Sequence, residues 1–261
     1  MLTEAQRDRI EAVLISPRNP LNIGAAARAI ANFGFSRLSV VAPYEPHWRE
    51  AKSAVGAEEL LKNARETESL KEAVAECTLV IGTGTLAHRR PEQPVVALPC
   101  LGPRIEQELE RGGGVALVFG PEKHGLTRKD LAQCHLLVEI PTDPRQPSMN
   151  LGQAVAVCLY ELAAERSASA SPGAGGKERS TARITHTDPD EPAAAPASMR
   201  DLNLLAEVIA ETMQAADYSP AAMQKANRHD LDLLLRRLVL TRDDARRSLG
   251  LFRRILWRLR R

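Results

Sequence analysis

Two polar loops follow two short apolar runs in the middle of the chain, and they hold residue types that could do chemistry. The runs are VALVF and LLVEI, and the loops span residues 120–127 and 141–150. Glu122 offers a carboxylate there, while Ser148 and Asn150 offer a hydroxyl and an amide. Strand ends that lead into loops and helix starts form the usual ligand-binding edge of an open α/β sheet. The two loops therefore predict a pocket.

Each of these side chains also has a structural interpretation. Glu122 could be a solvated acid, or it could orient a substrate or hold a neighbouring loop through its backbone amides. Ser148 and Asn150 could cap the helix expected over 149–165, and capping is compatible with ligand contact because a helix start presents free N–H donors. No G-x-S-x-G motif surrounds Ser148, which argues against a hydrolase. His124 has no second His or acid at ligand spacing, so no metal site is expected.

An earlier helix, made mostly of small residues, carries a lone arginine. Asn22 is expected to cap this helix and Gly34 to end it. Arg28 is either a surface residue paired with a carboxylate or a guanidinium directed at phosphate or a developing oxyanion. A role as proton acceptor would need an unusual environment, because arginine stays protonated.

The strand expected over 78–82 ends in the turn Thr83–Gly84–Thr85. The sequence GTGTLA is similar to a dinucleotide-binding turn, but the third glycine is missing and the turn does not follow the first strand. A nicotinamide-dependent oxidoreductase is therefore disfavoured. The turn is either purely structural or a place where the backbone closely approaches some cofactor.

Strands expected over 11–16, 38–41, 78–82, 115–119 and 136–140 alternate with helices. This order predicts an α/β fold with a mainly parallel sheet covered on both faces, over residues 1–166. Residues 167–200 predict a flexible linker, because 23 of the 32 residues from Ser167 to Ser198 are Ala, Ser, Gly, Pro or Thr. Residues 201–261 carry helical patterns and predict a small basic helical domain.

Charge distribution, apolar runs and cysteine spacing indicate which binding partners and which cellular compartment to expect. Residues 225–261 hold 12 Lys/Arg against 4 Asp/Glu, a net charge of +8, so the rest of the +2 chain carries −6. A basic segment of this kind predicts a polyanionic partner, most often nucleic acid. No run of ~18 apolar residues or apolar leader is present, and no CxxC pair occurs, so we expect a cytoplasmic protein without a membrane span, structural zinc or disulfides.

Three segments together resemble the three motifs of the SpoU branch of the SPOUT RNA methyltransferases. They are NPLNIGAAARA at 19–29, LVFGPEKHGLT at 117–127 and IPTDPRQPSMNLGQAVAVCLYE at 140–161, and their order and spacing match. The stretch from Met223 to Leu256 resembles, less closely, the tail of the TrmJ subgroup, which methylates the ribose 2′-oxygen at tRNA position 32. The chain departs from its relatives at Pro121 and Lys123, where they often carry a basic residue and an arginine, and at Pro147, where a serine is common.

The resemblance implies a deep trefoil knot in the C-terminal part of the sheet domain, S-adenosylmethionine as cofactor, tRNA as substrate, and a homodimer that completes the active site. It places the cofactor against Thr83, Gly84, Thr85, Gly120, Ile140, Pro147, Ser148 and Met149. It places the reaction at Asn22, Arg28, Glu122, Ser148 and Asn150. In the mechanism proposed for the family Arg28 activates the ribose hydroxyl; we prefer that it stabilises the forming alkoxide electrostatically.

Two other functions stay open at this point. Methylation of ribosomal RNA would use the same motifs, and the TrmJ-like tail argues against it. An RNA-binding assembly factor could keep this fold without the chemistry, and the intact set of five active-site positions argues against that. The sequence does not tell which bases are accepted at the target nucleotide or whether a whole tRNA is required.

Overall fold

The computed structural model describes residues 2–84, 91–164 and 194–261. Within them, seven parallel strands form one sheet in the order β3-β2-β1-β6-β4-β7-β5. The five strands predicted from the sequence are confirmed, and two three-residue strands extend the sheet at its edges. The strands are β1 Ile10–Ile15, β2 Arg37–Val41, β3 Arg65–Thr67, β4 Leu79–Thr83, β5 Val95–Ala97, β6 Val115–Phe119 and β7 Leu136–Glu139.

The central strands are buried along their whole length. Every residue of β1 and of β6 is buried, and the two strands run in register from Ile10 opposite Val115 to Leu14 opposite Phe119. Such continuous burial is expected for a parallel sheet with helices on both faces. The register brings the ends of β1, β4, β6 and β7 to one edge.

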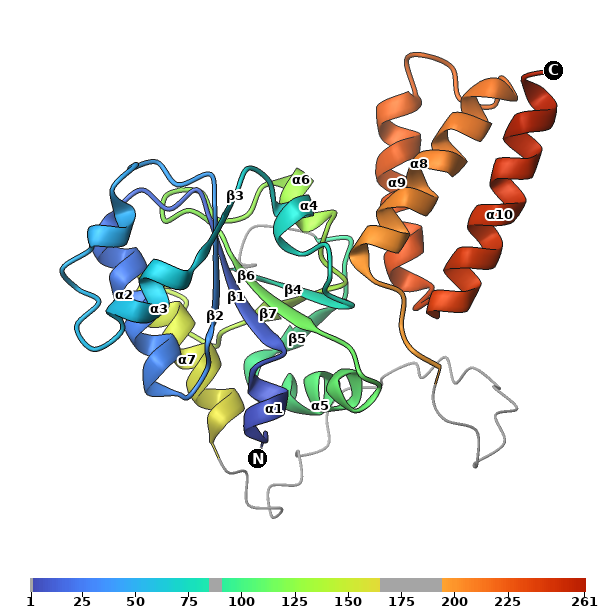
Figure 1. The fold of residues 1–261 in the computed structure, drawn as a ribbon. Coiled ribbons are helices and arrows are strands. Elements are labelled where there is room, and N and C mark those ends of the chain that lie inside the picture. Colours follow the sequence, from blue (N-terminus) through green and yellow to red (C-terminus); the bar gives the residue numbers. More distant parts are fainter. Residues whose placement is uncertain (1, 85–90, 165–193) are drawn as a thin grey trace.

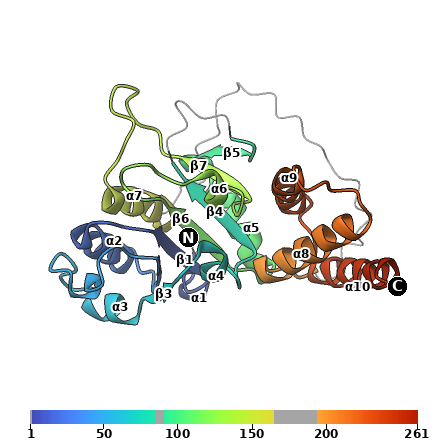
Figure 2. The ribbon, with the colours of Figure 1, turned by 90° about the horizontal axis from the view of Figure 1, so that it is seen from above.

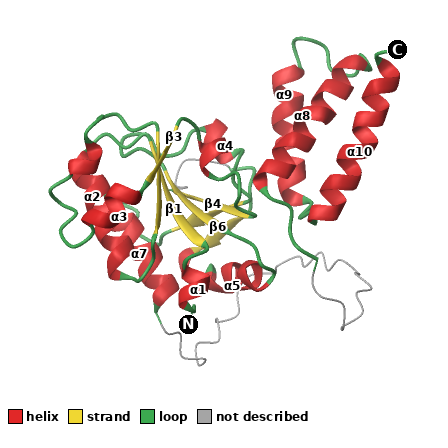
Figure 3. Ribbon diagram, viewed as in Figure 1, coloured by secondary structure: helices red, strands yellow, loops and turns green. Residues whose placement is uncertain are grey.

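Helices cover both faces of the sheet (Figures 2 and 3). The core on one face includes residues of α2 Pro20–Asn32, α3 Glu58–Asn63, α5 Gly102–Glu110 and α7 Leu151–Ala163. The other face packs against α4 Leu70–Ala73, α6 Arg128–Leu131 and the C-terminal helices. Short pieces complete the fold before residue 101: α1 Glu4–Arg7 and the 3₁₀ turns Trp48–Glu50 and Leu98–Cys100.

The start of α2 differs from the sequence prediction. Asn19, rather than Asn22, is the N-cap: its side chain accepts from the Leu21 amide at 3.0 Å, and Pro20 occupies the first turn. Proline suits that position because its missing N–H would have no helical partner there. The correction matters for function, because the Asn22 side chain is left free for other contacts. Gly34 follows the helix at φ 72°, which confirms the predicted stop.

Helices α2 and α7 lie side by side at very short distance. A Cβ atom on Gly152 would lie 2.7 Å from the Ala25 side chain, so only glycine fits at that contact. The small residues of both helices thus bring two of the three sequence motifs together. Phe33 and Tyr160 meet edge-on at the far end of the pair, with ring centroids 5.9 Å apart.

Three further helices follow residue 193: α8 Met199–Ala215, α9 Gln224–Arg237 and α10 Arg242–Leu259. The first begins two residues before the predicted boundary, and residues 195–197 pair with 240–242. The Met199 amide donates to the Cys77 carbonyl at 2.8 Å, and Met199 and Leu202 join the core beside α4. The helices therefore dock on the sheet domain just before β4; whether they fold as a separate domain stays a prediction.

Candidate active site

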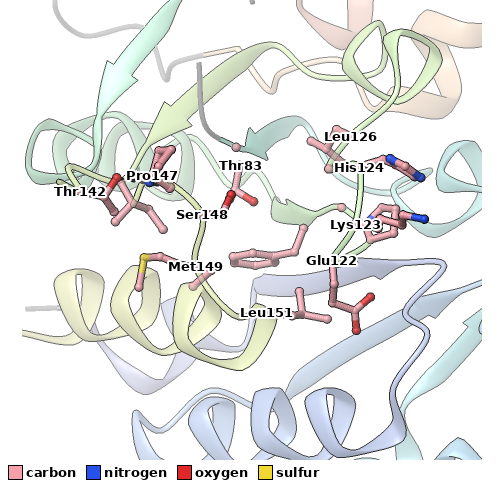
Figure 4. Close-up of a pocket in the computed structure, with 17 residues that line it drawn as sticks. Thr83, Glu122, Lys123, His124, Leu126, Thr142, Pro147, Ser148, Met149 and Leu151 are labelled. Atoms are coloured by element: carbon pink, nitrogen blue, oxygen red, sulfur yellow. Dashed lines mark hydrogen bonds between the residues drawn. The ribbon is translucent and has the colours of Figure 1, made fainter. Parts of the chain in front are cut away.

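A cavity of about 320 Å³ opens at the carboxyl ends of β4, β6 and β7. Three loops line it: the end of β4, the 120–127 loop after β6, and the 140–151 connection from β7 into α7 (Figure 4). The volume lies within the range of small-molecule and cofactor sites. Both loops singled out by the sequence therefore do form one pocket, and the end of β4 provides its third wall.

Glycines set the shape of this cavity. A Cβ atom on Gly120 would lie 2.4 Å from backbone atoms of Gly125 and Leu126, so the 120–127 loop can close tightly only around a glycine. Gly125 itself has φ 63°, and Thr127 then starts α6 with the predicted capping box to Asp130. At Gly84, in contrast, a Cβ atom would meet no atom of the described residues within 4 Å, so these residues leave space at the end of β4.

The pocket wall combines polar groups, including Thr142 and Ser148, with the apolar side chains of Ile140 and Met149. Thr83 ties the wall together, because its hydroxyl donates to the Val118 carbonyl at 3.0 Å. The Glu122 carboxylate points toward the β1–α2 connection, while Lys123 and His124 extend outward (Figure 4). Side chains that the sequence did not single out also line the cavity, namely Phe119, Leu126, Thr142, Leu151 and Ala154.

A chain of hydrogen bonds joins the three sequence motifs beside this cavity. The Asn22 side-chain amide donates to Glu122 Oε1 at 2.8 Å, and the Asn150 side-chain amide donates to Asn22 Oδ1 at 2.9 Å. Asn150 also caps α7 by accepting from the Gly152 amide at 2.9 Å. One carboxylate and two amides thus hold together residues that lie 100 and 128 positions apart in sequence.

Glu122 is the anchor of this network. Besides Asn22, its carboxylate accepts from the backbone amides of Arg18 at 3.3 Å and Asn19 at 3.5 Å. Partial burial alone would raise the pKa of the carboxyl group, but these hydrogen bonds outweigh it and the pKa lies below its ordinary value of 4.5. The carboxylate is therefore ionised at neutral pH. Of the interpretations of Glu122, the structure favours the one in which it holds a loop by its amides.

The network should make stability depend on pH. Because the pKa of Glu122 is lower in the folded chain, its contribution is complete above the unfolded-state value and is lost as pH falls through the folded-state value. Glu122→Gln should lower the free energy of unfolding at pH 7 by on the order of 1 kcal/mol, allowing for the exposure of the group. Urea denaturation at pH 7 and at about pH 3 measures this. A difference between variant and wild type that persists undiminished at the acid end would contradict the assignment.

The structure brings together most of the predicted site residues. Seven of the eight predicted cofactor residues line the cavity, and the eighth, Thr85, lies outside the described residues. Of the predicted catalytic set, Glu122 and Ser148 line the cavity and Asn22 and Asn150 reach it through the network. The seven lining residues are Thr83, Gly84, Gly120, Ile140, Pro147, Ser148 and Met149.

Arg28 is the one predicted catalytic residue that neither lines the cavity nor belongs to the hydrogen-bond network. It is exposed on α2 and is not part of the wall of its own chain's cavity. In the described ranges, no three His, Cys, Asp or Glu side chains are grouped so that they could hold a metal ion. The helices described there are also too short or too polar to cross a membrane.

An all-parallel α/β sheet with a pocket at the carboxyl ends of its strands is the architecture of a ligand-binding α/β protein. Comparison with known proteins identifies the family. The SpoU rRNA Methylase family matches residues 9–160, more than half of the chain. The chain therefore belongs to this family. The resemblance read from the three motifs is confirmed.

Relatives point to one subgroup. The chain is 42% identical over 156 residues to the tRNA (cytidine/uridine/adenosine-2′-O-)-methyltransferase TrmJ of Pseudomonas aeruginosa, a match that covers 59% of this chain and 60% of that protein. The chain is also 38% identical to the tRNA (cytidine/uridine-2′-O-)-methyltransferase TrmJ of Pectobacterium atrosepticum. That match covers 59% of this chain and 64% of that protein. The matched part is thus under two thirds of these relatives' own length.

A solved structure extends the likeness beyond the matched part. The crystal structure of TrmJ from Z. mobilis ZM4 superposes with a TM-score of 0.76 at 26% identity, covering 94% of this chain and 98% of that one. That likeness therefore includes residues beyond 160.

Proposed function

We propose that this protein is an S-adenosylmethionine-dependent tRNA ribose 2′-O-methyltransferase that acts in the cytoplasm. The observation that carries the proposal is the Asn22–Glu122–Asn150 network, which joins the three family motifs at the rim of one cavity. Family membership and the TrmJ relatives support the reaction type and the class of RNA. Nucleotide 32 of the anticodon loop is the proposed target, on the resemblance to the TrmJ subgroup.

The cavity suits the proposed cofactor. Its apolar wall of Ile140, Pro147 and Met149 can enclose an adenosine, and the open space at Gly84 leaves room beside the backbone. Thr85 is proposed to extend this wall. When bound, S-adenosylmethionine supplies a methyl group on a positively charged sulfur. The protein's part is to hold the ribose hydroxyl in line with that group and to exclude water.

The proposed knot belongs with this cavity. The wall is made by the chain leaving β4, β6 and β7, and in the proposal the 140–150 connection threads through the preceding loop before it enters α7. A cofactor bound at such a crossing would contact all three segments at once. The contacts of the cavity with the three segments support this arrangement.

We propose that a second copy of the chain completes the site with Arg28. On α2, the exposed positions Leu21, Arg28 and Asn32 share one face, and on the adjacent α7 Val157 and Tyr160 are exposed. Leu21 is 55% exposed and Tyr160 58%, so the paired helices present an apolar surface with one guanidinium on it. In a symmetric dimer through this surface, Arg28 of each copy can reach the pocket of the other.

Each group of site residues then has a defined task. Ser148 and the Asn22–Glu122–Asn150 network fix the loops against which the target nucleotide lies. Arg28 neutralises the negative charge that grows on the 2′-oxygen as its proton leaves and the methyl group transfers. We propose this electrostatic role rather than proton abstraction by arginine, because a guanidinium has no acceptor to offer.

The C-terminal helices are proposed to bind the tRNA backbone as a small basic domain joined by the 167–200 linker. Arg247, Arg254 and Arg258 are exposed on α10, seven and four positions apart, and so share one helix face. Each phosphate contact releases condensed counterions, which makes affinity fall with salt.

Neutralising this face should flatten the salt dependence of tRNA binding. With Arg247, Arg254 and Arg258 all changed to Gln, the slope of log affinity against log salt should fall by about one unit per lost contact. Filter binding of an unmodified tRNA transcript across a salt series measures the slope. Lys62→Gln, on α3 far from α10 (Figure 1), is the matched control and should leave it unchanged. An unaltered slope in the triple variant would refute this role for α10.

Transfer of labelled methyl from S-adenosylmethionine to unmodified tRNA tests the proposed function. The unaltered protein should label tRNA and should not label ribosomal RNA fragments. Label on ribosomal RNA alone would mean that ribosomal RNA, and not tRNA, is the substrate. Cofactor binding without any transfer would favour the non-catalytic assembly factor.

A further inference from the structure

The two strands beside the site end in an unusual way. β1 is followed by Ser16 and β2 by Ala42, and both residues have φ 43°. Positive φ is uncommon for residues other than glycine, and only four such residues occur in the described chain. The Ser16 amide donates to the Val41 carbonyl and the Ala42 amide to the Thr67 carbonyl, both at 2.8 Å. The two neighbouring strands, β1 and β2, are therefore both followed by a turn with a strained residue at positive φ.

These turns place Arg18 and Tyr44 together. The Tyr44 amide donates to the Pro17 carbonyl at 3.2 Å, and the Arg18 guanidinium carbon lies 5.5 Å from the centre of the Tyr44 ring. The backbone of the same Arg18 binds the Glu122 carboxylate. Tyr44 is therefore coupled, through one residue, to the network that joins the three motifs.

Tyr44 nevertheless stays 70% exposed. A surface tyrosine needs no explanation by itself, and a cation–π contact adds little stability at an exposed site. The strain in both turns is the second observation, because strained non-glycine backbone is retained where function requires its geometry. Here the geometry presents one aromatic ring and one guanidinium on the connection whose Arg18 amide donates to Glu122, a residue of the cavity wall.

We propose that Tyr44, held by Arg18, is a stacking platform for an unpaired base next to the target nucleotide; this rests on the proposed function. Single-stranded RNA is recognised by stacking of splayed bases on aromatic rings and arginine planes. Glu45 and Glu50 lie close in sequence and are exposed, so a phosphate is disfavoured there and a base face is favoured. Stacking tolerates any base, so the platform binds an anticodon-loop nucleotide without reading its identity.

Binding of an unmodified tRNA transcript by the full-length chain tests this. Tyr44→Ala should weaken affinity about five-fold or more, as expected for the loss of one stacked base. Tyr44→Phe keeps the ring and should bind within about two-fold of wild type. Because stacking releases no counterions, the salt slope should stay unchanged in Tyr44→Ala, and so should affinity for S-adenosylmethionine. Val55→Ala removes another exposed apolar side chain from the same connection and is the control.

The outcomes separate the inference from the function it rests on. If wild type methylates tRNA and Tyr44→Ala binds as tightly, the platform is refuted and the function stands. An affinity loss accompanied by a flatter salt slope would also refute stacking, because it would indicate lost phosphate contacts. If wild type transfers no methyl group to tRNA, the proposed function fails and the platform with it.

Discussion

Replacing Arg28 by alanine should reduce methyl transfer to tRNA by about 10²–10³-fold, the usual effect of removing one group that stabilises a developing oxyanion. Affinity for S-adenosylmethionine should not change, because Arg28 is absent from the wall of its own chain's cavity and, across the proposed dimer, faces the ribose 2′-oxygen rather than the cofactor. Single-turnover transfer of labelled methyl, with calorimetry of cofactor binding, measures both. The effect should appear in kcat rather than in KM for the cofactor.

Arg28→Lys is the informative companion variant. Lysine keeps the charge but loses the planar, forked donor set, so partial activity is expected. A nearly wild-type rate in Arg28→Ala would show that Arg28 takes no part in the reaction.

Gly120→Ala should have the second large effect, on the cofactor itself. The added methyl group would lie 2.4 Å from the backbone of Gly125 and Leu126, and no side chain can move aside to accommodate it. The 120–127 loop must therefore open. We expect affinity for S-adenosylmethionine to fall at least about ten-fold and stability to fall by about 1–3 kcal/mol. Calorimetric titration and thermal unfolding measure these quantities.

Gly84→Ala is the control for Gly120→Ala, since in the described part of the chain a methyl group there meets no atom within 4 Å. It should unfold like wild type. Any loss of cofactor affinity in Gly84→Ala would then reflect contact with the ligand rather than damage to the fold. Unchanged cofactor affinity in Gly120→Ala would contradict the placement of the cofactor in this cavity.

The two variants together test whether the site is shared between copies. A mixed dimer of Arg28→Ala and Gly120→Ala chains holds one intact pocket, on the Arg28→Ala chain, facing an intact Arg28 on the other. Mixing the two impaired proteins should therefore give more activity than the two measured separately would sum to. If Arg28 served its own pocket, mixing would restore nothing.

The sequence predicted the central strands and the pocket loops because both leave local signals. Buried parallel strands are apolar runs, and the loops carry glycine, proline and capping residues. β3 and β5 were missed because three residues at a sheet edge show no periodicity. Asn22 was misassigned as a cap because Asn19 has the same chemistry; only the position of Glu122, 100 residues on, shows what Asn22 contacts.

Other features depend on register and docking, which no local pattern encodes. Arg18 and Tyr44 meet only because β1 and β2 pair in parallel, with Ile15 opposite Val41. For the basic C-terminal segment the sequence gives a net charge of +8 over residues 225–261 but not which of the charged side chains are exposed. Arg236 is 3% exposed and donates to Asn203 Oδ1 at 2.7 Å, and Arg260 pairs with Glu211 on α8. Part of the charge is used to hold the helices together.

The position of the transferred methyl group tests the central claim most directly. Alkali cleaves RNA by attack of the 2′-hydroxyl, so a 2′-O-methylated nucleotide stays joined to its 3′ neighbour. After reaction with labelled S-adenosylmethionine and complete alkaline hydrolysis of the tRNA, we expect the label in a single alkali-resistant dinucleotide that begins at nucleotide 32. Label in mononucleotides would mean methylation of a base, and would contradict a ribose 2′-O-methyltransferase.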